Sequence, residues 1–422
     1  GPDRSESHHV ARRHDRGDAG VEQPLGSGEP TVEGEDRLGD HVVVDGHTTC
    51  DRGVHEPGDL AEYRRVATRA DQETDAFVAE RVLDGISQPA AIEFLPDGRA
   101  LVAHRDRGLL TLADCNTGAK TDIEGLPKLV VWSDAGVHDI ELHPEYAKNG
   151  WIYLSYTEGE QVHSTAVLDR FRLDGNKAVD VQRIFTADAG SEEPYHFAGR
   201  IQFVDGYLFF AIGDRQHPPR AQDTSNHAGT VLRLNDDGSV PEDNPFVGVA
   251  EEGKPKPKPR PEIWSYGHRN PLGLYRHPET GELWLHEHGP RGGDEVQRVK
   301  KGANYGWPIV SYGFQYEGGP IGMGIPEQEG METPAWVYVP SIAPSDLVIY
   351  QGGAFPAWRG SFLIGALAGM HLNRLVFRDG EVVAEERLAP RVLGRIRSIA
   401  VDRAGLIYLG SDNGEVWRLS PD

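Results

Sequence analysis

The feature that most constrains the fold is a hairpin-like segment that recurs six times between residues 92 and 411. Each copy has an apolar segment, a turn with Pro, Asp or Gly, and a second apolar or aromatic segment, a pattern typical of a β-hairpin. Successive turns lie roughly 45–80 residues apart, which accommodates a four-stranded blade and a loop. The copies are "IEFLPDGRALVAH" (92–104), "IELHPEYAKNGWIYLSY" (140–156), "IQFVDGYLFFAIGD" (201–214), "LYRHPETGELWLHEHG" (274–289), "VIYQGGAFPAWRGSFLIGA" (348–366) and "IAVDRAGLIYLGS" (399–411).

Six such hairpins predict an all-β protein, a six-bladed β-propeller with four-stranded antiparallel blades. Two β-sandwiches are the alternative, but they would not need the same hairpin six times. Ring closure is expected to pair "AFVAERVL" (76–83) with "GEVWRL" (414–419). The longest connections, 215–273 and 290–347, are expected to build a functional face, because long inserts between elements often carry function.

The N-terminal region differs from the rest of the chain in composition. Residues 1–62 contain no Phe, Trp or Tyr and are dense in charged residues. Such a segment buries too little apolar surface to offset the entropy lost on ordering. We therefore predict a poorly ordered or loosely attached extension over 1–74 and a propeller catalytic domain over 75–422.

Charge and hydropathy narrow the classes of partner. The formal net charge of -23 predicts that the protein does not bind nucleic acid, because its field repels phosphate. No run of about 18 apolar residues is present, so no transmembrane segment is expected. No signal peptide is visible at the start of the sequence.

Two residues of the third hairpin suggest acid–base chemistry. His196 precedes the strand that opens this hairpin, and Asp214 ends it. Because the two ends of a hairpin lie close in space, the carboxylate is expected beside the imidazole, where it would fix the tautomer of a general base. A plain packing role for His196 is the alternative.

A second candidate lies in "EIWSYGHRNPLGL" (262–274), where Arg269 and Asn270 precede a proline at the start of a hairpin. A guanidinium on such a braced turn suits the polarisation of a carbonyl or the binding of an anion. An arginine that only braces neighbouring loops is the alternative.

The stretch "HEHGPRGGDEVQRVKKGANYGWP" (286–308) is rich in turns and oxygen donors. Its turns can direct the carbonyls of Gly289 and Pro290 inward, while Asp294 and Glu295 offer carboxylates. Calcium prefers six to eight oxygen ligands of these kinds. The spacing does not match an EF-hand loop, so turn residues with solvated acids remain the alternative.

Longer motifs carry a family resemblance. The sequence from about residue 75 to 420 resembles the soluble quinoprotein sugar dehydrogenases that depend on pyrroloquinoline quinone (PQQ), known as the glucose/sorbosone dehydrogenase family and including the aldose sugar dehydrogenases. The resemblance implies a six-bladed propeller and a periplasmic or secreted location. The motifs are "HFAGR", "GTVLRLNDDGSVPEDNPF" (229–246), "YGHRNPLGL", "EHGPRGGDE", "GANYGWP" and "PSIAPS" (340–345).

The resemblance implies roles for the three candidate catalytic residues. His196 matches the general base that takes a proton from the sugar hydroxyl, and Asp214 matches the residue that orients it. Arg269 matches the arginine that polarises the accepting quinone oxygen. PQQ would be the hydride acceptor, as is usual when a cofactor carries the redox step.

The resemblance also implies the cofactor site. Asn270 lies beside Arg269, and Arg395 and Arg397 in "LGRIRSIA" match arginines near PQQ and its carboxylates. Asp134 falls at the position of a cofactor-contacting glutamine.

Two calcium ions are implied as well. One would bind PQQ and the backbone carbonyls of Gly289 and Pro290. A second, structural ion would use Glu295 and the carbonyl of Tyr305, with Asp294 as a further candidate.

The chain departs from the family pattern at five positions. Asp134 replaces a glutamine, which adds a carboxylate near a cofactor that is itself a tri-acid, and His138 stands inside a leucine pair. Ala368 lies where some relatives carry a lysine that pairs with a PQQ carboxylate. Ala198 replaces a frequent glycine, and Tyr338 replaces a usual tryptophan.

Taken together, the sequence predicts a quinoprotein oxidoreductase that oxidises an aldose or related polyol to a lactone-type product, with an unidentified electron acceptor. Two alternatives stay open. One is a non-catalytic carbohydrate- or protein-binding propeller that has lost PQQ, and the other is a calcium-dependent propeller lactonase or hydrolase.

Overall fold

The structure is a computed structural model of the 422-residue chain and describes residues 41–44, 76–249 and 258–422. Of the expected N-terminal extension, only β1 (His41–Val44) falls within these ranges. The rest of residues 1–74 lies outside the described part of the chain.

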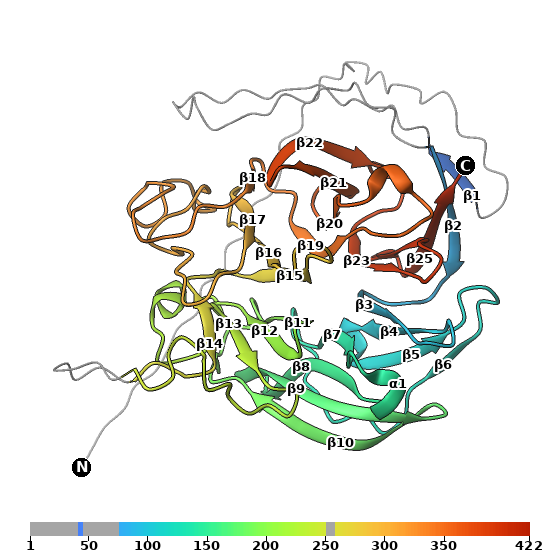
Figure 1. Ribbon diagram of the computed structural model, residues 1–422, viewed down its shortest axis with the longest axis horizontal. Coiled ribbons are helices and arrows are strands. Elements are labelled where there is room, and N and C mark those ends of the chain that lie inside the picture. The colour runs from blue at the N-terminus through green and yellow to red at the C-terminus, as the bar shows by residue number, and fades with distance from the viewer. Residues whose placement is uncertain (1–40, 45–75, 250–257) are drawn as a thin grey trace, which may run out of the picture. The chain divides into compact units, whose positions relative to one another are not determined.

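The described strands form six antiparallel sheets, which we number as blades 1 to 6 along the chain and which surround a common centre (Figure 1). The predicted six-bladed β-propeller is confirmed. Blade 1 contains β3 (Pro89–Phe94), β4 (Ala100–His104), β5 (Leu109–Ala113) and β6 (Lys120–Asp122); blade 2 contains β7 (Val137–Leu142), β8 (Ile152–Glu160), β9 (His163–Asp174) and β10 (Lys177–Thr186); blade 3 contains β11 (Ala198–Val204), β12 (Tyr207–Ile212), β13 (Thr230–Leu234) and β14 (Ile263–Tyr266).

The remaining blades have the same antiparallel order, and blade 6 has an additional strand. Blade 4 contains β15 (Pro271–Arg276), β16 (Leu283–Glu287), β17 (Asp294–Arg298) and β18 (Trp336–Tyr338); blade 5 contains β19 (Pro344–Ile349), β20 (Phe362–Ala366), β21 (His371–Arg378) and β22 (Glu381–Leu388); blade 6 contains β23 (Ile396–Val401), β24 (Ile407–Ser411), β25 (Glu415–Pro421), β2 (Phe77–Leu83) and β1.

The ring closes by pairing strands from the two ends of the described chain. Strand β2 runs antiparallel to β25, with Phe77 opposite Pro421 and Ala79 opposite Leu419. Strand β1 then pairs with the other edge of β2. The blue β2 and the dark red β25 lie side by side in Figure 1. The expected closure by residues 76–83 and 414–419 is therefore confirmed.

Each of the six repeated sequence segments forms the first two strands of one blade. The first strand of every blade contacts the first strands of its neighbours, so these six strands surround the centre. They line a cavity of about 340 Å³, to whose walls all six blades contribute residues. The hairpin repeat is thus the element that builds the inside of the ring.

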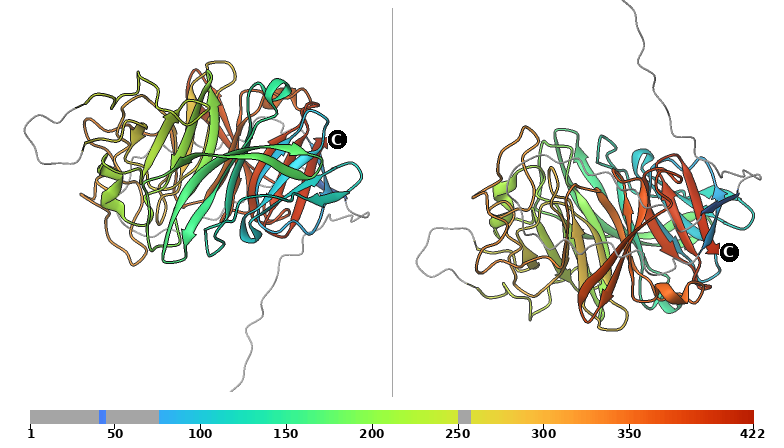
Figure 2. Two further views of the ribbon diagram at one scale, coloured as in Figure 1. Left: turned by 90° about the horizontal axis from the view of Figure 1, so that it is seen from below. Right: turned by 90° about the horizontal axis from the view of Figure 1, so that it is seen from above.

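Antiparallel order also determines which connections share a rim of the ring. A first strand begins where the second strand ends, so the residues before the first strand and the connection from second to third strand lie at the same rim. In the two side views the blade strands run between the two rims (Figure 2). Connections of these two kinds carry every candidate site residue outside the strands except Tyr305, which lies in the long connection between β17 and β18.

Apolar side chains fill the space between neighbouring blades. At the closure, Phe77 of β2 and Leu419 of β25 belong to a buried cluster that includes Trp358 and Leu409. Phe77 meets Trp358 edge to face, with ring centroids 6.0 Å apart. Among the described residues, no helix has the length and apolar character needed to cross a membrane.

The closure contact can be tested with Phe77→Ala. Phe77 is 1% exposed, so its truncation should lower the free energy of unfolding by about 3–5 kcal/mol through lost burial and a cavity. Denaturant titration of wild type and variant measures this change. Phe314→Ala is the matched control, because a side chain that is 40% exposed should change stability by about 0.5 kcal/mol or less. Equal effects of the two variants would contradict the closure argument.

Candidate active site

The third hairpin brings His196 and Asp214 into direct contact. Ala198 of β11 pairs with Ile212 of β12, and the amide of Gly213 donates to the carbonyl of Phe197, so the residues just beyond face each other. The Nδ1 atom of His196 lies 2.7 Å from Oδ1 of Asp214. The His196 side chain is 12% exposed and that of Asp214 is fully buried.

Asp214 is held by two further donors. The amide of Gln216 donates to Oδ1 at 2.8 Å, and Nε1 of Trp307 donates to Oδ2 at 2.8 Å. Three N–H groups therefore compensate the charge of one buried carboxylate. Trp307 belongs to the connection after β17, and its role could not be derived from sequence spacing because 93 positions separate it from Asp214.

The backbone at His196 is unusual. His196 has φ of 55° and Ala198 has φ of 57°, both in the left-handed region that non-glycine residues seldom occupy. Such conformations persist where the surrounding structure enforces them, and they concentrate at functional sites. Here the dyad contact on one side and the pairing of β11 with β12 on the other hold the turn.

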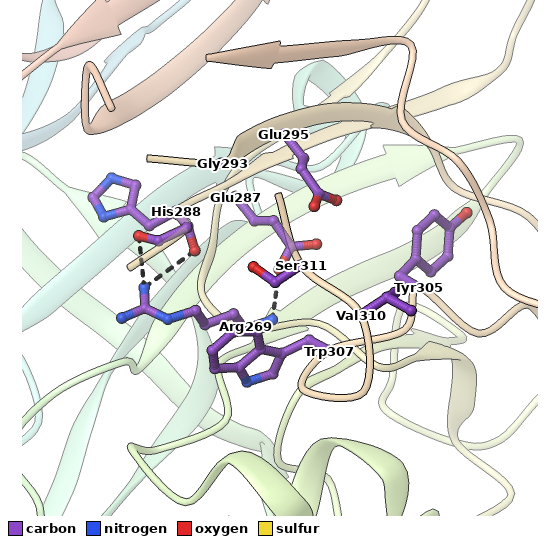
Figure 3. Close-up of a pocket in the computed structure, with 10 residues that line it drawn as sticks. Arg269, Glu287, His288, Gly293, Glu295, Tyr305, Trp307, Val310 and Ser311 are labelled. Atoms are coloured by element: carbon purple, nitrogen blue, oxygen red, sulfur yellow. Dashed lines mark hydrogen bonds between the residues drawn. The ribbon is translucent and has the colours of Figure 1, made fainter. Parts of the chain in front are cut away.

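Arg269 lies next to this dyad. Its carbonyl accepts the amide of Asp214 at 2.8 Å, and its own amide donates to Oε2 of Glu287 at 2.5 Å. Its Nη1 donates to the carbonyls of His288 and Gly289, both at 3.1 Å (Figure 3). The guanidinium carbon is 5.4 Å from the centre of the Trp307 ring. The candidate base, its orienting carboxylate and the candidate arginine therefore share one network.

Buried polar groups hold the backbone of Arg269 in place through Glu287. Glu287 ends β16, and its Oε1 accepts Nδ1 of His268 at 3.0 Å and the side-chain amide of Gln297. Nearby, Oδ1 of Asn270 is buried and has no hydrogen-bond partner among the described residues. An orphaned buried acceptor at a rim is suited to meet a donor from a ligand.

The Gly289–Pro290 turn is braced by Asp294. The Asp294 carboxylate is fully buried and accepts the amide of Gly289 at 3.0 Å, the hydroxyl of Ser341 at 2.9 and 2.7 Å, and the amides of Ile342 and Ala343 at 2.9 and 3.1 Å. Both of its oxygens are thus occupied by donors from two loops. Asp294 fixes the turn that carries the two candidate carbonyls.

A small cavity next to this turn is lined by Glu287, Gly289, Glu295 and Tyr305, among other residues (Figure 3). Burial and the neighbouring carboxylates of Glu287 and Asp294 raise the pKa of Glu295 well above its usual range. Among the described residues, no hydrogen bond to the Glu295 carboxylate is formed. The Tyr305 ring stacks on His268 with centroids 4.4 Å apart, and its hydroxyl donates to the carbonyl of Arg298.

The same cavity is lined by Val310 and Ser311 from the connection between β17 and β18. This connection also supplies Trp307. Part of the long insert 290–347 therefore contributes residues to the candidate site.

Arg395 and Arg397 lie on the same rim in blade 6. Both bind Asp412: Nε and Nη2 of Arg397 donate to its two oxygens at 2.5 and 2.8 Å, and Nε of Arg395 donates to Oδ2 at 3.1 Å. Arg395 also donates to the carbonyl of Leu367 at 3.3 Å. Asp134 lies on this rim as well, because its amide donates to the carbonyl of Pro194, two residues before His196, at 3.2 Å.

Comparison with known proteins assigns the family. Residues 86–418 match the sequence model of the family described as Glucose / Sorbosone dehydrogenase. The chain belongs to this family.

Two similar proteins and one similar solved structure are named as sugar dehydrogenases. The aldose sugar dehydrogenase YliI of Escherichia coli (strain K12) is 34% identical, over 81% of this chain and 92% of the relative. The quinoprotein glucose dehydrogenase B of Acinetobacter calcoaceticus is 26% identical, over 71% of this chain and 77% of the relative. A crystal structure of a glucose dehydrogenase is 36% identical, with a TM-score of 0.76 over 82% of this chain and 99% of that structure.

The positions that depart from the family pattern have different environments in the structure. Tyr338 is buried in β18, and its hydroxyl donates to Asn373 at 2.7 Å, so it is part of the core. Ala368 is exposed at the rim, with its amide donating to the carbonyl of Ile342 at 3.0 Å. Asp134 is paired with an arginine that the sequence reasoning missed, Arg105.

His138 supports the turn that carries His196. Its ring stacks on Phe197 with centroids 5.3 Å apart, its Nε2 lies 2.8 Å from Oγ1 of Thr157, and a Cβ at Gly199 would lie 2.5 Å from its own Cβ. Burial, followed by the positive charges of nearby arginines, lowers the pKa of His138 to about 3. His138 therefore remains neutral in the folded protein across the physiological range.

This lowered pKa predicts an acid-dependent loss of stability. The unfolded chain protonates His138 below about pH 6.5, whereas the folded chain does so only near pH 3. The stabilising contribution is therefore present above pH 6.5 and is lost as pH falls from about 6.5 toward 3. His138→Gln should reduce the loss of unfolding free energy between pH 7 and pH 5 by up to about 2 kcal/mol.

Denaturant titrations at the two pH values measure this effect. His163→Gln is the control, since His163 is exposed and its substitution should leave the pH dependence unchanged. An unaltered pH dependence in His138→Gln would contradict the buried neutral imidazole.

Proposed function

We propose that this chain is a PQQ-dependent sugar dehydrogenase that oxidises the hydroxyl of an aldose or related sugar to a lactone-type product. The observation that carries the proposal is the His196–Asp214 contact beside Arg269, on one rim of a propeller of this family. The sugar dehydrogenase names of its relatives support the substrate class.

The residues at the rim suit a cofactor with several carboxylates. Arg269, Arg395 and Arg397 offer guanidinium groups, which bind planar anions well. The orphaned Oδ1 of Asn270 offers an acceptor next to Arg269. When bound, PQQ would supply the two-electron acceptor for hydride.

His196 would act as the general base. In the contact with Asp214, Nδ1–H of His196 donates to the carboxylate, which leaves Nε2 unprotonated and able to accept the proton of a sugar hydroxyl. Asp214 holds the ring in this tautomer and compensates the positive charge that forms on it. Trp307 holds Asp214 through Nε1.

Arg269 would provide positive charge where negative charge develops. Its guanidinium is oriented by the carbonyls of His288 and Gly289, and its backbone is anchored to Asp214 and Glu287. Charge held in advance in a water-poor site stabilises a transition state without reorganisation.

Two calcium sites are part of the proposal. Glu295 and the Tyr305 carbonyl would hold a structural ion, since Glu295 is a half-buried carboxylate that lines a cavity and lacks a hydrogen-bond donor among the described residues. Gly289 and Pro290 would hold an ion through their carbonyls; the Gly289 carbonyl accepts one bond from Arg269 and has a second lone pair. Asp294 is left out of the ligand set because four donor groups occupy its oxygens.

The electron acceptor is unidentified, and the periplasmic or secreted location remains a proposal that follows from the family. The net charge of -23 continues to favour small-molecule partners over nucleic acid.

Dye reduction tests the proposed activity. The chain is mixed with PQQ and calcium, and reduction of an artificial acceptor is followed with a panel of aldoses. Sugar-dependent reduction that requires PQQ supports the proposal. Sugar binding without reduction would instead indicate a binding propeller, and acid release from lactones without PQQ would indicate a hydrolase.

His196→Ala tests the base. Turnover should fall by about 10²–10⁴-fold, the usual contribution of a general base, while PQQ binding stays near the wild-type value. Steady-state kinetics and a PQQ titration measure the two quantities. His217→Ala is the control, because His217 is exposed and lies on the same loop as Asp214. Wild-type turnover in His196→Ala would exclude His196 as the base.

Calcium removal tests the metal sites. An ion that binds only the folded state stabilises the folded state, by about 2.7 kcal/mol when the free ion concentration is 100 times Kd. A chelator should therefore lower the melting temperature, and calcium should restore it. Glu295→Gln should lose most of this response, whereas Glu317→Gln, at an exposed position, should keep it. An unchanged melting temperature after verified metal loss would exclude the structural ion.

A further inference from the structure

Asp134 adds a negative charge to a rim that, under the proposed function, must accept an anionic cofactor. Its side chain is 41% exposed, and its amide is bound to the segment that carries His196. Without a partner, this carboxylate would repel the carboxylates of such a ligand. The structure shows how its charge is compensated.

Arg105 is the partner of Asp134. Its Nη1 donates to Oδ1 of Asp134 at 3.0 Å, and its side chain is 17% exposed. Its Nε and Nη2 donate to the side-chain oxygen of Gln88 at 3.0 and 2.7 Å, and its amide donates to the Gln88 carbonyl at 3.1 Å. These bonds use three of the five guanidinium N–H groups. Two N–H groups therefore remain that could donate to a ligand.

The two residues are brought together by a close approach of neighbouring blades. Arg105 begins the short 3₁₀ turn Arg105–Arg107 between β4 and β5 of blade 1, and Asp134 precedes β7 of blade 2. A Cβ on Gly136, which has φ of 148°, would lie 1.9 Å from the Arg105 carbonyl oxygen. The glycine therefore permits the contact that places the guanidinium beside the carboxylate.

Arg105 also lies near the arginines of blade 6. Burial lowers the pKa of Arg105, and the charge of Arg397 lowers it further, whereas Asp134 and Asp412 act in the opposite direction. The group formed by Arg105, Arg395, Arg397, Asp134 and Asp412 carries three positive and two negative charges, a net +1. Without Arg105 the net charge would be zero, and Asp134 would be the member without an ion-pair partner.

We propose that Arg105 is a positioning residue of the cofactor site, which neutralises Asp134 and extends the Arg395–Arg397 pair into a cationic wall for a polycarboxylate ligand. This inference rests on the proposed function, because PQQ supplies the carboxylates. The positive charge of Arg105, which belongs to blade 1, compensates the negative charge that Asp134 adds at the start of blade 2.

A double-mutant cycle tests the inference through binding. The Kd of PQQ in saturating calcium is measured by fluorescence quenching and calorimetry for wild type, Arg105→Gln, Asp134→Asn and the double variant. Arg105→Gln should raise Kd by about tenfold or more, because it exposes an unpaired carboxylate to the ligand. Asp134→Asn should bind as tightly as wild type or more tightly, and the double variant should return to within about threefold of wild type.

Restoration in the double variant separates charge compensation from a structural role. If Arg105 only braced blades 1 and 2, the double variant would bind as weakly as Arg105→Gln, and that result would overturn the inference. Arg99→Gln is the control, since Arg99 forms an exposed pair with Asp97 in blade 1 and should leave Kd unchanged. Circular dichroism and melting temperature verify that each variant folds. If Arg105→Gln does not fold, Arg105→Lys replaces it and should keep wild-type affinity for PQQ, because it retains the positive charge. A tenfold loss of PQQ affinity in Arg105→Lys would also overturn the inference.

Failure of the two proposals can be distinguished. A wild-type chain that does not bind PQQ would remove the proposed function together with this inference. A wild-type chain that binds PQQ, with a double variant that is not restored, would remove only the inference about Arg105.

Discussion

The pairing of β2 with β25 is the constraint on which the rest of the structure depends. It joins strands that begin and end the described propeller, and it closes the ring with a buried contact between Phe77 and Trp358. Because the ring is closed, all six first strands surround one centre. The loops at one rim therefore converge, although they come from sequence segments hundreds of residues apart.

Convergence at this rim creates an electrostatic environment that the whole chain does not have. The protein carries a net charge of -23, yet Arg105, Arg269, Arg395 and Arg397 all lie on this one rim. Each is held by a carboxylate or by backbone carbonyls, so the guanidinium groups are oriented before a ligand arrives. Preorganised charge of this kind favours an anionic cofactor more than a neutral one.

The site also shows how a loop structure can be made rigid. Asp214 and Asp294 are both fully buried, and each accepts several N–H or O–H donors from different segments. One holds the candidate base, and the other holds the turn with the candidate carbonyl ligands. The left-handed backbone of His196 is maintained in this setting, since the surrounding hydrogen bonds offset its conformational cost.

The fold and part of the site followed from the sequence because they depend on local patterns. The hairpin repeat predicted the blades, and the short hairpin between His196 and Asp214 predicted their contact, since antiparallel register places the ends of a hairpin together. Trp307, Glu287 and Arg105 could not be assigned in this way. Their partners lie on other turns or other blades, and only the closed ring determines which of these turns meet. The carboxylate of Asp294 illustrates the same limit: its sequence neighbours suggested a metal ligand, whereas the approach of the Ser341–Ala343 loop supplies the donors that occupy it.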